Sequence, residues 1–274
     1  MIKDITLGQF FPIESPIHKL DPRAKILSAI VYIFAIFFVN GYSGYVAVAL
    51  FTYVIILMSK VPLKLILKSL KPLIFLLLFT SLINIFMTDG KIVTVFDVPL
   101  RLGFLKITYQ GVDIAVKMAL RLILLVAGTS LLTFTTSPIA LTDGIEKLLS
   151  PFKKIGLPSH ELAMMMSIAI RFIPTLIEET DKIMKAQKAR GADFESGNLL
   201  KRVKALVPIL VPLFISSFRR ADELAVAMES RCYRGGEGRT RLKELKLSII
   251  DFKAGVFMLL FILVIIATNI FVKV

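Results

Sequence analysis

Long stretches without charge alternate with short charged connections along the first part of the chain. Lys25 and Lys60 bracket 34 uncharged residues. One membrane-spanning helix needs about 20 apolar residues, so this stretch is long enough for two helices. The turn-forming cluster Asn-Gly-Tyr-Ser-Gly at 40–44 divides it. The pattern therefore predicts helices at about 25–40 and 44–60, joined by a tight turn.

Three further charge-free stretches predict three more spans. Uncharged residues fill positions 72–88, 122–142 and 254–272, and the second of these spans is expected to begin earlier, near Gly111. Each stretch approaches or reaches the length that crosses a bilayer as a helix. The sequence thus predicts an all-α integral membrane protein with about five transmembrane helices.

Basic residues predict the direction of these spans. Lys19, Arg23 and Lys25 precede the first span, and four lysines within 60–71 follow the second. Loops on the cytoplasmic side are enriched in Lys and Arg. We therefore expect a cytoplasmic N-terminus and an outer turn at 40–44. Five crossings of the cell membrane then place the C-terminus outside.

The segment 137–250 differs from the rest because basic and acidic residues are mixed in it and its apolar positions follow a helical period. A short amphipathic stripe at 145–152 suits a helix on the membrane surface. Two long helices are expected after it, at about 159–190 and 199–233. The predicted parts are a transmembrane part at 1–136, a cytoplasmic or interfacial module of long amphipathic helices at 137–250, and a last transmembrane helix at 251–274.

The two long helices share one design, with an apolar first half and a charged second half. Pro174 lies in the first helix, and Pro208 and Pro212 lie in the second, where proline is expected to bend a helix. The charge-free runs 162–170 and 205–218 are short for a span. They are therefore expected to lie along the inner face and to contact other membrane helices.

The ends of these helices are predicted from residues that commonly cap helices. Ser159 is expected to cap the first helix at its start. Gly191 is expected to end that helix, and Gly235-Gly236 to end the second.

Composition narrows the class of protein further. The chain has 34 Lys and Arg against 20 Asp and Glu, a net charge of +14, and a mean hydropathy of +0.77. This hydropathy argues against an ordinary soluble domain, and the mixed charge on the long helices disfavours nucleic-acid binding. The sequence lacks the GxxxxGK[ST] phosphate loop, and Met164 stands where a zinc-binding HExxH motif at His160 needs its second histidine. We expect no catalytic residue, metal or cofactor.

Two short strings at the ends of the long helices stand out. They are Ala189-Arg190-Gly191 and Ser230-Arg231-Cys232, each with one arginine between small residues. Small neighbours let a helix end enter a narrow groove, where a guanidinium can pair with a carboxylate through two hydrogen bonds. A terminal arginine also simply complements the helix dipole. The repetition of the string after two matching helices favours docking.

These features resemble the transmembrane (T) component of energy-coupling factor transporters, the CbiQ/EcfT family, over nearly the whole chain. The second tip departs from the family's usual Ala-Arg-Gly but keeps the arginine and the small neighbours. Besides the two tips, the resemblance is carried by Leu-Asp-Pro-Arg-Ala-Lys at 20–25, Arg-Phe-Ile-Pro-Thr-Leu at 171–176, Phe-Arg-Arg-Ala-Asp-Glu-Leu-Ala at 218–225 and Tyr-Arg-Gly-Gly at 233–236.

The resemblance implies a non-catalytic coupling subunit of an importer for vitamins or trace metals. Two cytoplasmic ATP-binding-cassette ATPases and one small membrane substrate-binding (S) subunit are its implied partners, within the lipid bilayer. The ATPases would receive the helix tips, and the S subunit would contact the apolar halves. The implied ATPase-coupling residues are Arg190, Arg231, Ala189, Gly191, Ser230 and Cys232, and the implied S-subunit contacts are Met164, Met165, Pro208 and Pro212.

Three other functions remain open at this point. A self-contained ABC importer permease should place polar groups at mid-membrane, where Asn84 is the main exception in nearly apolar central spans. An intramembrane enzyme needs paired catalytic groups on facing spans, and we find none in the sequence. A basic membrane anchor or scaffold would bind acidic lipid through many charges, so that Arg190 and Arg231 alone would matter little.

Overall fold

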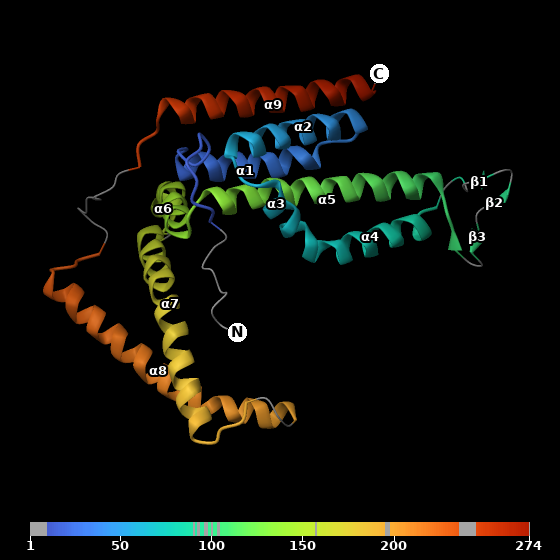
Figure 1. Cartoon of the computed structure of the whole chain (residues 1–274). Helices are drawn as coiled ribbons and strands as arrows, with labels where there is room; N and C mark the ends of the chain where they lie inside the picture. Colours follow the sequence, from blue (N-terminus) through green and yellow to red (C-terminus); the bar gives the residue numbers. More distant parts are fainter. Residues whose placement is uncertain are drawn as a thin grey trace. The chain divides into compact units, whose positions relative to one another are not determined.

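The computed structural model describes residues 10–89, 91, 94–95, 98–99, 101–102, 105–156, 158–194, 198–235 and 245–273. The chain divides into two compact units (Figure 1). One, here called the apolar unit, comprises residues 8–144 and 245–274. The other, the long-helix unit, comprises residues 1–7 and 145–244. Each unit is described by itself.

The apolar unit consists mainly of long helices. Two short antiparallel hairpins precede α5, with Thr94 opposite Pro99 in one and Arg101 opposite Lys106 in the other. The elements are α1 (Pro22–Phe37), α2 (Tyr42–Ser59), α3 (Leu63–Leu70), the 3-10 turn η1 (Lys71–Leu73), α4 (Ile74–Met87), β1 (Thr94–Val95), β2 (Val98–Pro99), β3 (Arg101–Leu102), β4 (Leu105–Lys106), α5 (Tyr109–Thr135) and α9 (Ile249–Lys273).

Local chemistry explains where these helices begin and end. The carboxylate of Asp21 accepts the backbone N–H of Arg23 at the start of α1, and Pro22 occupies the first turn, where a proline is tolerated. Thr108 caps α5 by accepting the N–H of Gly111. Helix α2 ends at Ser59, and the next residue, Lys60, adopts a left-handed conformation.

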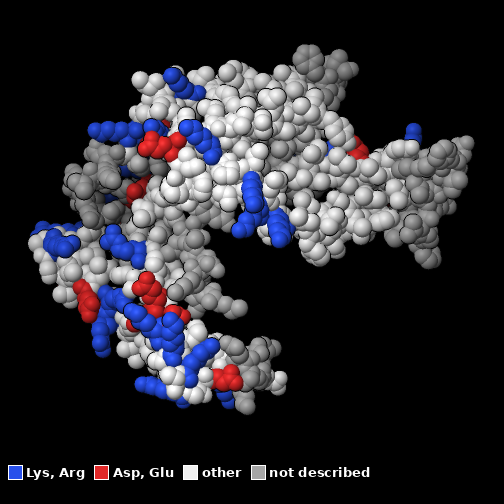
Figure 2. Space-filling model, in the orientation of Figure 1, with Lys and Arg blue, Asp and Glu red and all other residues white. Residues whose placement is uncertain are grey.

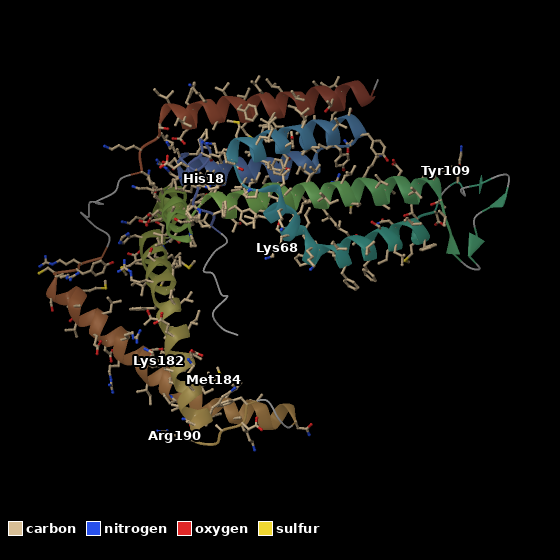
Figure 3. All side chains as sticks on the ribbon, viewed as in Figure 1. His18, Lys68, Tyr109, Lys182, Met184 and Arg190 are labelled. Carbon is tan, nitrogen blue, oxygen red and sulfur yellow. The ribbon has the colours of Figure 1, made fainter. Side chains whose placement is uncertain are left out.

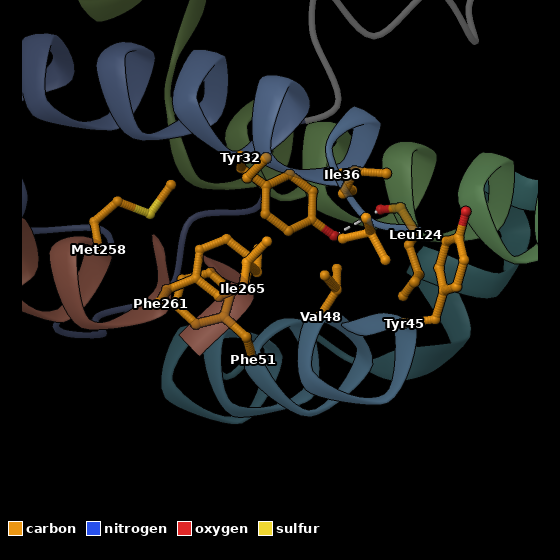
Figure 4. Packing of buried hydrophobic residues seen from close by; sticks show 11 residues of the cluster. Tyr32, Ile36, Tyr45, Val48, Phe51, Leu124, Met258, Phe261 and Ile265 are labelled. Atoms are coloured by element: carbon orange, nitrogen blue, oxygen red, sulfur yellow. Dashed lines mark hydrogen bonds between the residues drawn. The ribbon is translucent and has the colours of Figure 1, made fainter. Parts of the chain in front are cut away.

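The core of the apolar unit lies where α1, α2, α5 and α9 converge (Figure 4). Phe51 of α2 stacks on Phe261 of α9 with ring centroids 3.8 Å apart. The hydroxyl of Tyr32 donates to the carbonyl oxygen of Leu124 at 2.9 Å, so its polar end is satisfied within the core. Gly128 permits this packing, because a Cβ there would lie 2.1 Å from Cε1 of Tyr32.

Helix α4 packs on α5 but buries none of its own side chains within the unit. Phe75 and Phe79 stack on each other along its exposed face, and Phe75 is 79% exposed. Such a face is stable in lipid, where apolar side chains need no protein cover. Basic side chains gather over the preceding helix α3 (Figure 2), which is amphipathic and carries Lys64 and Lys68.

The structure supports the predicted class, an all-α membrane protein, with five helical segments long and apolar enough to cross a membrane among the described residues. Their membership differs in part from the five predicted spans. Helix α1 has 16 residues and falls short of the length, whereas Ser159–Ala189, predicted to lie along the inner face, reaches it. The third span also begins earlier, because Leu63–Met87 forms one continuous helical segment.

The long-helix unit contains the predicted pair of long helices. They pack against each other, and α7 continues through Pro174, as α8 does through Pro208 and Pro212. Helix α6 begins in the apolar unit, so the division between the units falls within it. The elements are α6 (Pro138–Leu149), the 3-10 helix η2 (Ser150–Ile155), α7 (Ser159–Ala189) and α8 (Leu199–Ser230).

The predicted cap at Ser159 is wrong. Ser159 is already the first residue of α7, and its side chain makes no capping hydrogen bond. The carbonyl oxygen of Pro158 accepts the N–H of Leu162 at 3.0 Å, so Pro158 takes the capping position through its backbone.

Candidate functional site: two arginine-capped helix ends

Helix α7 ends in a tight backbone motif around Arg190. The N–H of Gly191 donates to the carbonyl oxygen of Lys188 at 3.0 Å, and that of Ala192 to Gln187 at 3.0 Å. Gly191 has a φ of +88°. These two bonds and the left-handed residue define a Schellman motif, in which Arg190 is the last, half-helical residue.

Helix α8 ends in the same motif around Arg231. The N–H of Cys232 donates to the carbonyl oxygen of Glu229 at 2.8 Å, and that of Tyr233 to Met228 at 3.0 Å. The left-handed residue is Cys232, with a φ of +56°. An arginine therefore occupies the same capping position at the end of both helices.

The prediction that Gly235-Gly236 ends the second helix is wrong. Helix α8 stops at Ser230, and Cys232 makes the reversal. Gly235 also has a positive φ, but it lies beyond the motif, and Gly236 lies outside the described residues. A residue with a Cβ in the left-handed region costs roughly 1–2 kcal/mol. The second tip is thus held in a conformation that glycine adopts more readily.

Both guanidinium groups are available to a partner. Arg190 and Arg231 are exposed, and Figure 3 shows Arg190 at the end of α7. Neither forms an ion pair with a carboxylate among the described residues. Their small neighbours Ala189, Gly191, Ser230 and Cys232 are exposed as well. A groove on another protein therefore has access to the arginine fork without displacing an internal salt bridge.

Because α7 and α8 pack antiparallel, the two arginine-capped ends lie far from each other. Arg220 pairs with Glu179 at 2.8 Å, and Nε2 of Gln187 donates to the carbonyl oxygen of Pro208 at 3.5 Å. The later of the two α7 residues contacts the earlier of the two α8 residues, so the helices run antiparallel where they meet. Arg190 comes just after this contact, whereas Arg231 lies about 35 Å further along α8 than Pro208 at 1.5 Å per residue.

A continuous apolar stripe runs along the first part of α8. Its members recur every three or four residues and are exposed: Val203, Val207, Val211, Phe214 and Phe218. Phe214 and Phe218 are each 63% exposed. Beside this stripe, Pro208 and Pro212 are exposed too. An apolar face of this length indicates a membrane or protein partner.

Helix α7 offers a smaller apolar surface near its start. Met165 is 54% exposed, whereas Met164 is half-buried. His160 is placed by Glu146, whose Oε1 lies 3.1 Å from its Nδ1. Within the described ranges, no group of three or more His, Cys, Asp or Glu side chains is arranged to hold a metal ion.

Comparison with known proteins shows which family this chain resembles. A family model described as "CbiQ: Cobalt transport protein" matches residues 14–242. A protein of Clostridium kluyveri, named energy-coupling factor transporter transmembrane protein EcfT, is 64% identical over 254 residues, 93% of each chain. Proteins with the same name from Acidaminococcus fermentans and Bacillus subtilis are 56% identical over 96% of each chain and 49% identical over 89% of this chain and 91% of theirs.

The chain belongs to the CbiQ/EcfT family. It is thus a transmembrane component of an energy-coupling factor transporter, as the sequence resemblance indicates. The family match runs through both arginine-capped ends and all of α7 and α8. The family match stops before α9. The matches to the Clostridium kluyveri and Acidaminococcus fermentans proteins cover 254 and 264 residues, so they include part of α9.

In this CbiQ/EcfT chain the predicted site residues fall into separate groups. Ala189, Arg190 and Gly191 lie together at one helix end, and Ser230, Arg231 and Cys232 at the other. The methionines 164 and 165 lie near the start of α7, and the prolines 208 and 212 in the first half of α8. The apolar run 205–218 is predicted to contact other membrane helices, but the individual residues of the α8 stripe are not predicted as site residues, although their spacing of three and four residues is visible in the sequence.

Proposed function

We propose that this chain couples two cytoplasmic ATPases to a small membrane S subunit during ATP-driven uptake of a vitamin or trace metal. Arg190 and Arg231 dock the ends of α7 and α8 in grooves of the two ATPases. The S subunit contacts Met164, Met165, Pro208 and Pro212. ATP hydrolysis takes place in the partners, and the S subunit carries the substrate.

One observation carries the proposal: two separate helices present an arginine at the same position of the same capping motif. A Schellman motif fixes the backbone on both sides of the arginine, so less conformational freedom is lost when the guanidinium binds. Each arginine is exposed and flanked by small residues. Two equivalent tips suit two equivalent grooves, one on each ATPase.

The apolar surfaces behind the tips support the second contact. The stripe from Val203 to Phe218 on α8 suits an apolar membrane partner. Methionines such as Met165 adapt to varied shapes, which suits a surface that has to move against its partner. The contact between Glu179 and Arg220 joins the helices, so displacement of one tip moves the other helix with it.

The cell membrane is the proposed location, with the N-terminus in the cytoplasm and the C-terminus outside. Lys19 precedes α1, Arg23 and Lys25 lie at its start, and the lysines of α3 follow α2. The distribution of these residues supports the orientation through the bias of cytoplasmic loops toward positive charge.

Co-purification of the full complex tests the docking role. Arg190→Glu and Arg231→Glu each place a negative charge where the proposal has a guanidinium pair with a carboxylate of an ATPase groove, and each should weaken ATPase binding about tenfold or more. The double variant should lose the most ATPase and transport. Lys182→Glu on α7 and Arg219→Glu on α8 are matched controls, because they make the same charge change at exposed positions away from the tips.

The outcomes distinguish docking of the helix ends in the ATPases from a role as a basic membrane anchor. An intact complex and normal uptake in the Arg190→Glu, Arg231→Glu double variant would contradict the proposal. If both arginines are changed to alanine with little effect, the basic anchor is favoured, since lipid attraction spreads over many charges. Met165→Glu and Pro212→Glu should release the S subunit while the ATPases stay bound, which tests the second contact separately.

A further inference from the structure

The apolar unit contains a cavity of about 550 Å³ among α1, α2, α5, α9 and the segment before α1. Its volume lies in the range of sites that hold small molecules. Along α1 it extends from Lys25 to Tyr32, which is about 10 Å at the helical rise. Pro16, Ile17 and Leu20 border it at the end that the basic residues place toward the cytoplasm.

The lining offers little to a polar ligand. Most of its surface belongs to apolar side chains such as Ile55, Leu131 and Phe257. The hydroxyl of Tyr32 is engaged with Thr52 and Leu124, and that of Thr135 donates to Leu131. Because these polar groups are already satisfied, the interior favours a hydrocarbon chain over a hydrophilic vitamin or metal ion.

Of the two lysines that line the cavity, Lys25 is already engaged. Nζ of Lys25 donates to the carbonyl oxygens of His18 and Thr135. The carboxylates of Asp21 and Asp251 lie near it and offset its charge and that of Arg23.

Lys253 also lines the cavity, and this residue is exposed. Among the described residues its ammonium has no carboxylate partner. A positive charge beside an apolar cavity at the predicted inner membrane surface complements an anionic amphiphile.

We propose that this cavity binds an acyl chain of an anionic phospholipid of the cytoplasmic leaflet, with the lipid phosphate at Lys253. The cavity opens beside helices long and apolar enough to lie in the bilayer, so the ligand is supplied by the surrounding membrane. A lipid held there fills the space between α1, α2, α5 and α9. The lining of the cavity shares no residue with the helix tips or the apolar stripe of α8.

Native mass spectrometry of the purified full-length chain tests the site, with phosphatidylglycerol and phosphatidylcholine of identical acyl chains as probes. The wild-type chain should retain phosphatidylglycerol preferentially. Lys253→Ala should lower that preference about fivefold. Ala254→Leu adds carbon atoms to the cavity wall and should reduce bound lipid about tenfold. Lys64→Ala and Ala267→Leu are the matched controls at exposed positions outside the lining.

Four results would overturn the proposal. The first is equal retention of the two lipids by the wild-type chain, and the second is equal lipid loss in Ala254→Leu and Ala267→Leu. The third is retention of free fatty acid in place of phospholipid. A gain of bound lipid when residues 1–9 are removed would instead identify those residues as the occupant and would also overturn it. Thermal unfolding confirms that each variant is folded before its lipid is counted.

Discussion

The backbone N–H of Asp21 donates a hydrogen bond of 2.7 Å to Oδ1 of Asp251, 230 residues further along the chain. The other carboxylate oxygen of Asp251 accepts the N–H of Ser248 at 2.7 Å, while Oγ of Ser248 accepts the N–H of Ile250. These bonds cap the start of α9 in a variant of the capping box, in which the hydroxyl of Ser248 accepts the N–H of the second helical residue and not the third. One buried carboxylate thus caps the start of α9 and also accepts a hydrogen bond from Asp21, the residue that caps α1.

Asp251→Asn should destabilise the apolar unit. The amide keeps one oxygen, but its NH2 group then faces a backbone N–H donor, so one of the two hydrogen bonds is lost. A hydrogen bond to a charged group contributes about 1.5–3 kcal/mol, and Asp251 is only 7% exposed. We expect a loss of about 2 kcal/mol, measured as a lower thermal unfolding temperature of the full chain in detergent.

The exposed Asp222 on α8 provides the control for this variant. Asp222→Asn makes the same chemical change without a buried hydrogen bond, so its unfolding temperature should stay within a degree or so of the wild-type value. Equal unfolding temperatures for Asp251→Asn and the wild-type chain would show that the link between α1 and α9 contributes no stability.

Asp21 makes stability depend on pH in a defined direction. Hydrogen bonds from the guanidinium of Arg23 lower the pKa of the Asp21 carboxyl below its ordinary value. The folded state therefore binds the proton less readily than the unfolded state. The stabilisation is complete above the unfolded pKa of about 3.9 and is lost as pH falls through the lower folded value.

Thermal unfolding between pH 3 and pH 7 checks this linkage. The wild-type unfolding temperature should fall at the acid end, and Asp21→Asn should be less stable at pH 7 and show a smaller fall. Asp222→Asn should keep the wild-type pH profile. An identical acid slope in Asp21→Asn and the wild-type chain would assign the acid sensitivity to other carboxyl groups.

The sequence predicts the apolar helices well because charges bracket them. Helices α2 and α9 agree with their charge-free stretches within about five residues. The chain does break between α1 and α2, but at 38–41, because the last three residues of the 40–44 cluster belong to α2. The start of the third span is the main error. Lys64 and Lys68 suggest a connection, yet they lie on the polar side of an amphipathic helix that continues into α4. Counting charges alone overlooks a helix whose lysines share one face.

The candidate site is predicted in its residues but not in its geometry. Arg190 and Arg231 stand out because small residues flank both. The reversal at Cys232 is not predicted because residues with a Cβ rarely adopt a positive φ, so glycine draws attention to position 235 instead. The contact between Asp21 and Asp251 has no local signal, although the spacing of Ser248 and Asp251 does indicate a capping box.

The two tips should respond oppositely to changes at the left-handed position. Gly191→Ala adds a Cβ that meets nothing within 4 Å, so its cost of about 1 kcal/mol comes from the backbone. Cys232→Gly removes the same strain and should stabilise its tip by about 1 kcal/mol, less the freedom that glycine adds to the unfolded chain. Hydrogen exchange of the amides of Ala192 and Tyr233, which close the two motifs, measures both effects.

Gly255→Ala in α9 is the control for these variants, because its added Cβ also meets nothing within 4 Å and it lies outside both tips. It should leave exchange at Ala192 and Tyr233 unchanged. Slower exchange at Ala192 in Gly191→Ala, or faster exchange at Tyr233 in Cys232→Gly, would contradict the assigned strain.

The proposed orientation can be tested with the single cysteine of the chain. Cys232 is exposed, and the proposal places it in the cytoplasm because α8 follows the segment expected inside. A membrane-impermeant maleimide should label it in inside-out vesicles and after detergent treatment, but not in intact cells. Asn40→Cys in a Cys232→Ser chain should give the reverse result, because the exposed Asn40 lies in the connection between α1 and α2, which is expected outside. Labelling of Cys232 in intact cells would reverse the orientation, and with it the side on which Arg231 meets an ATPase.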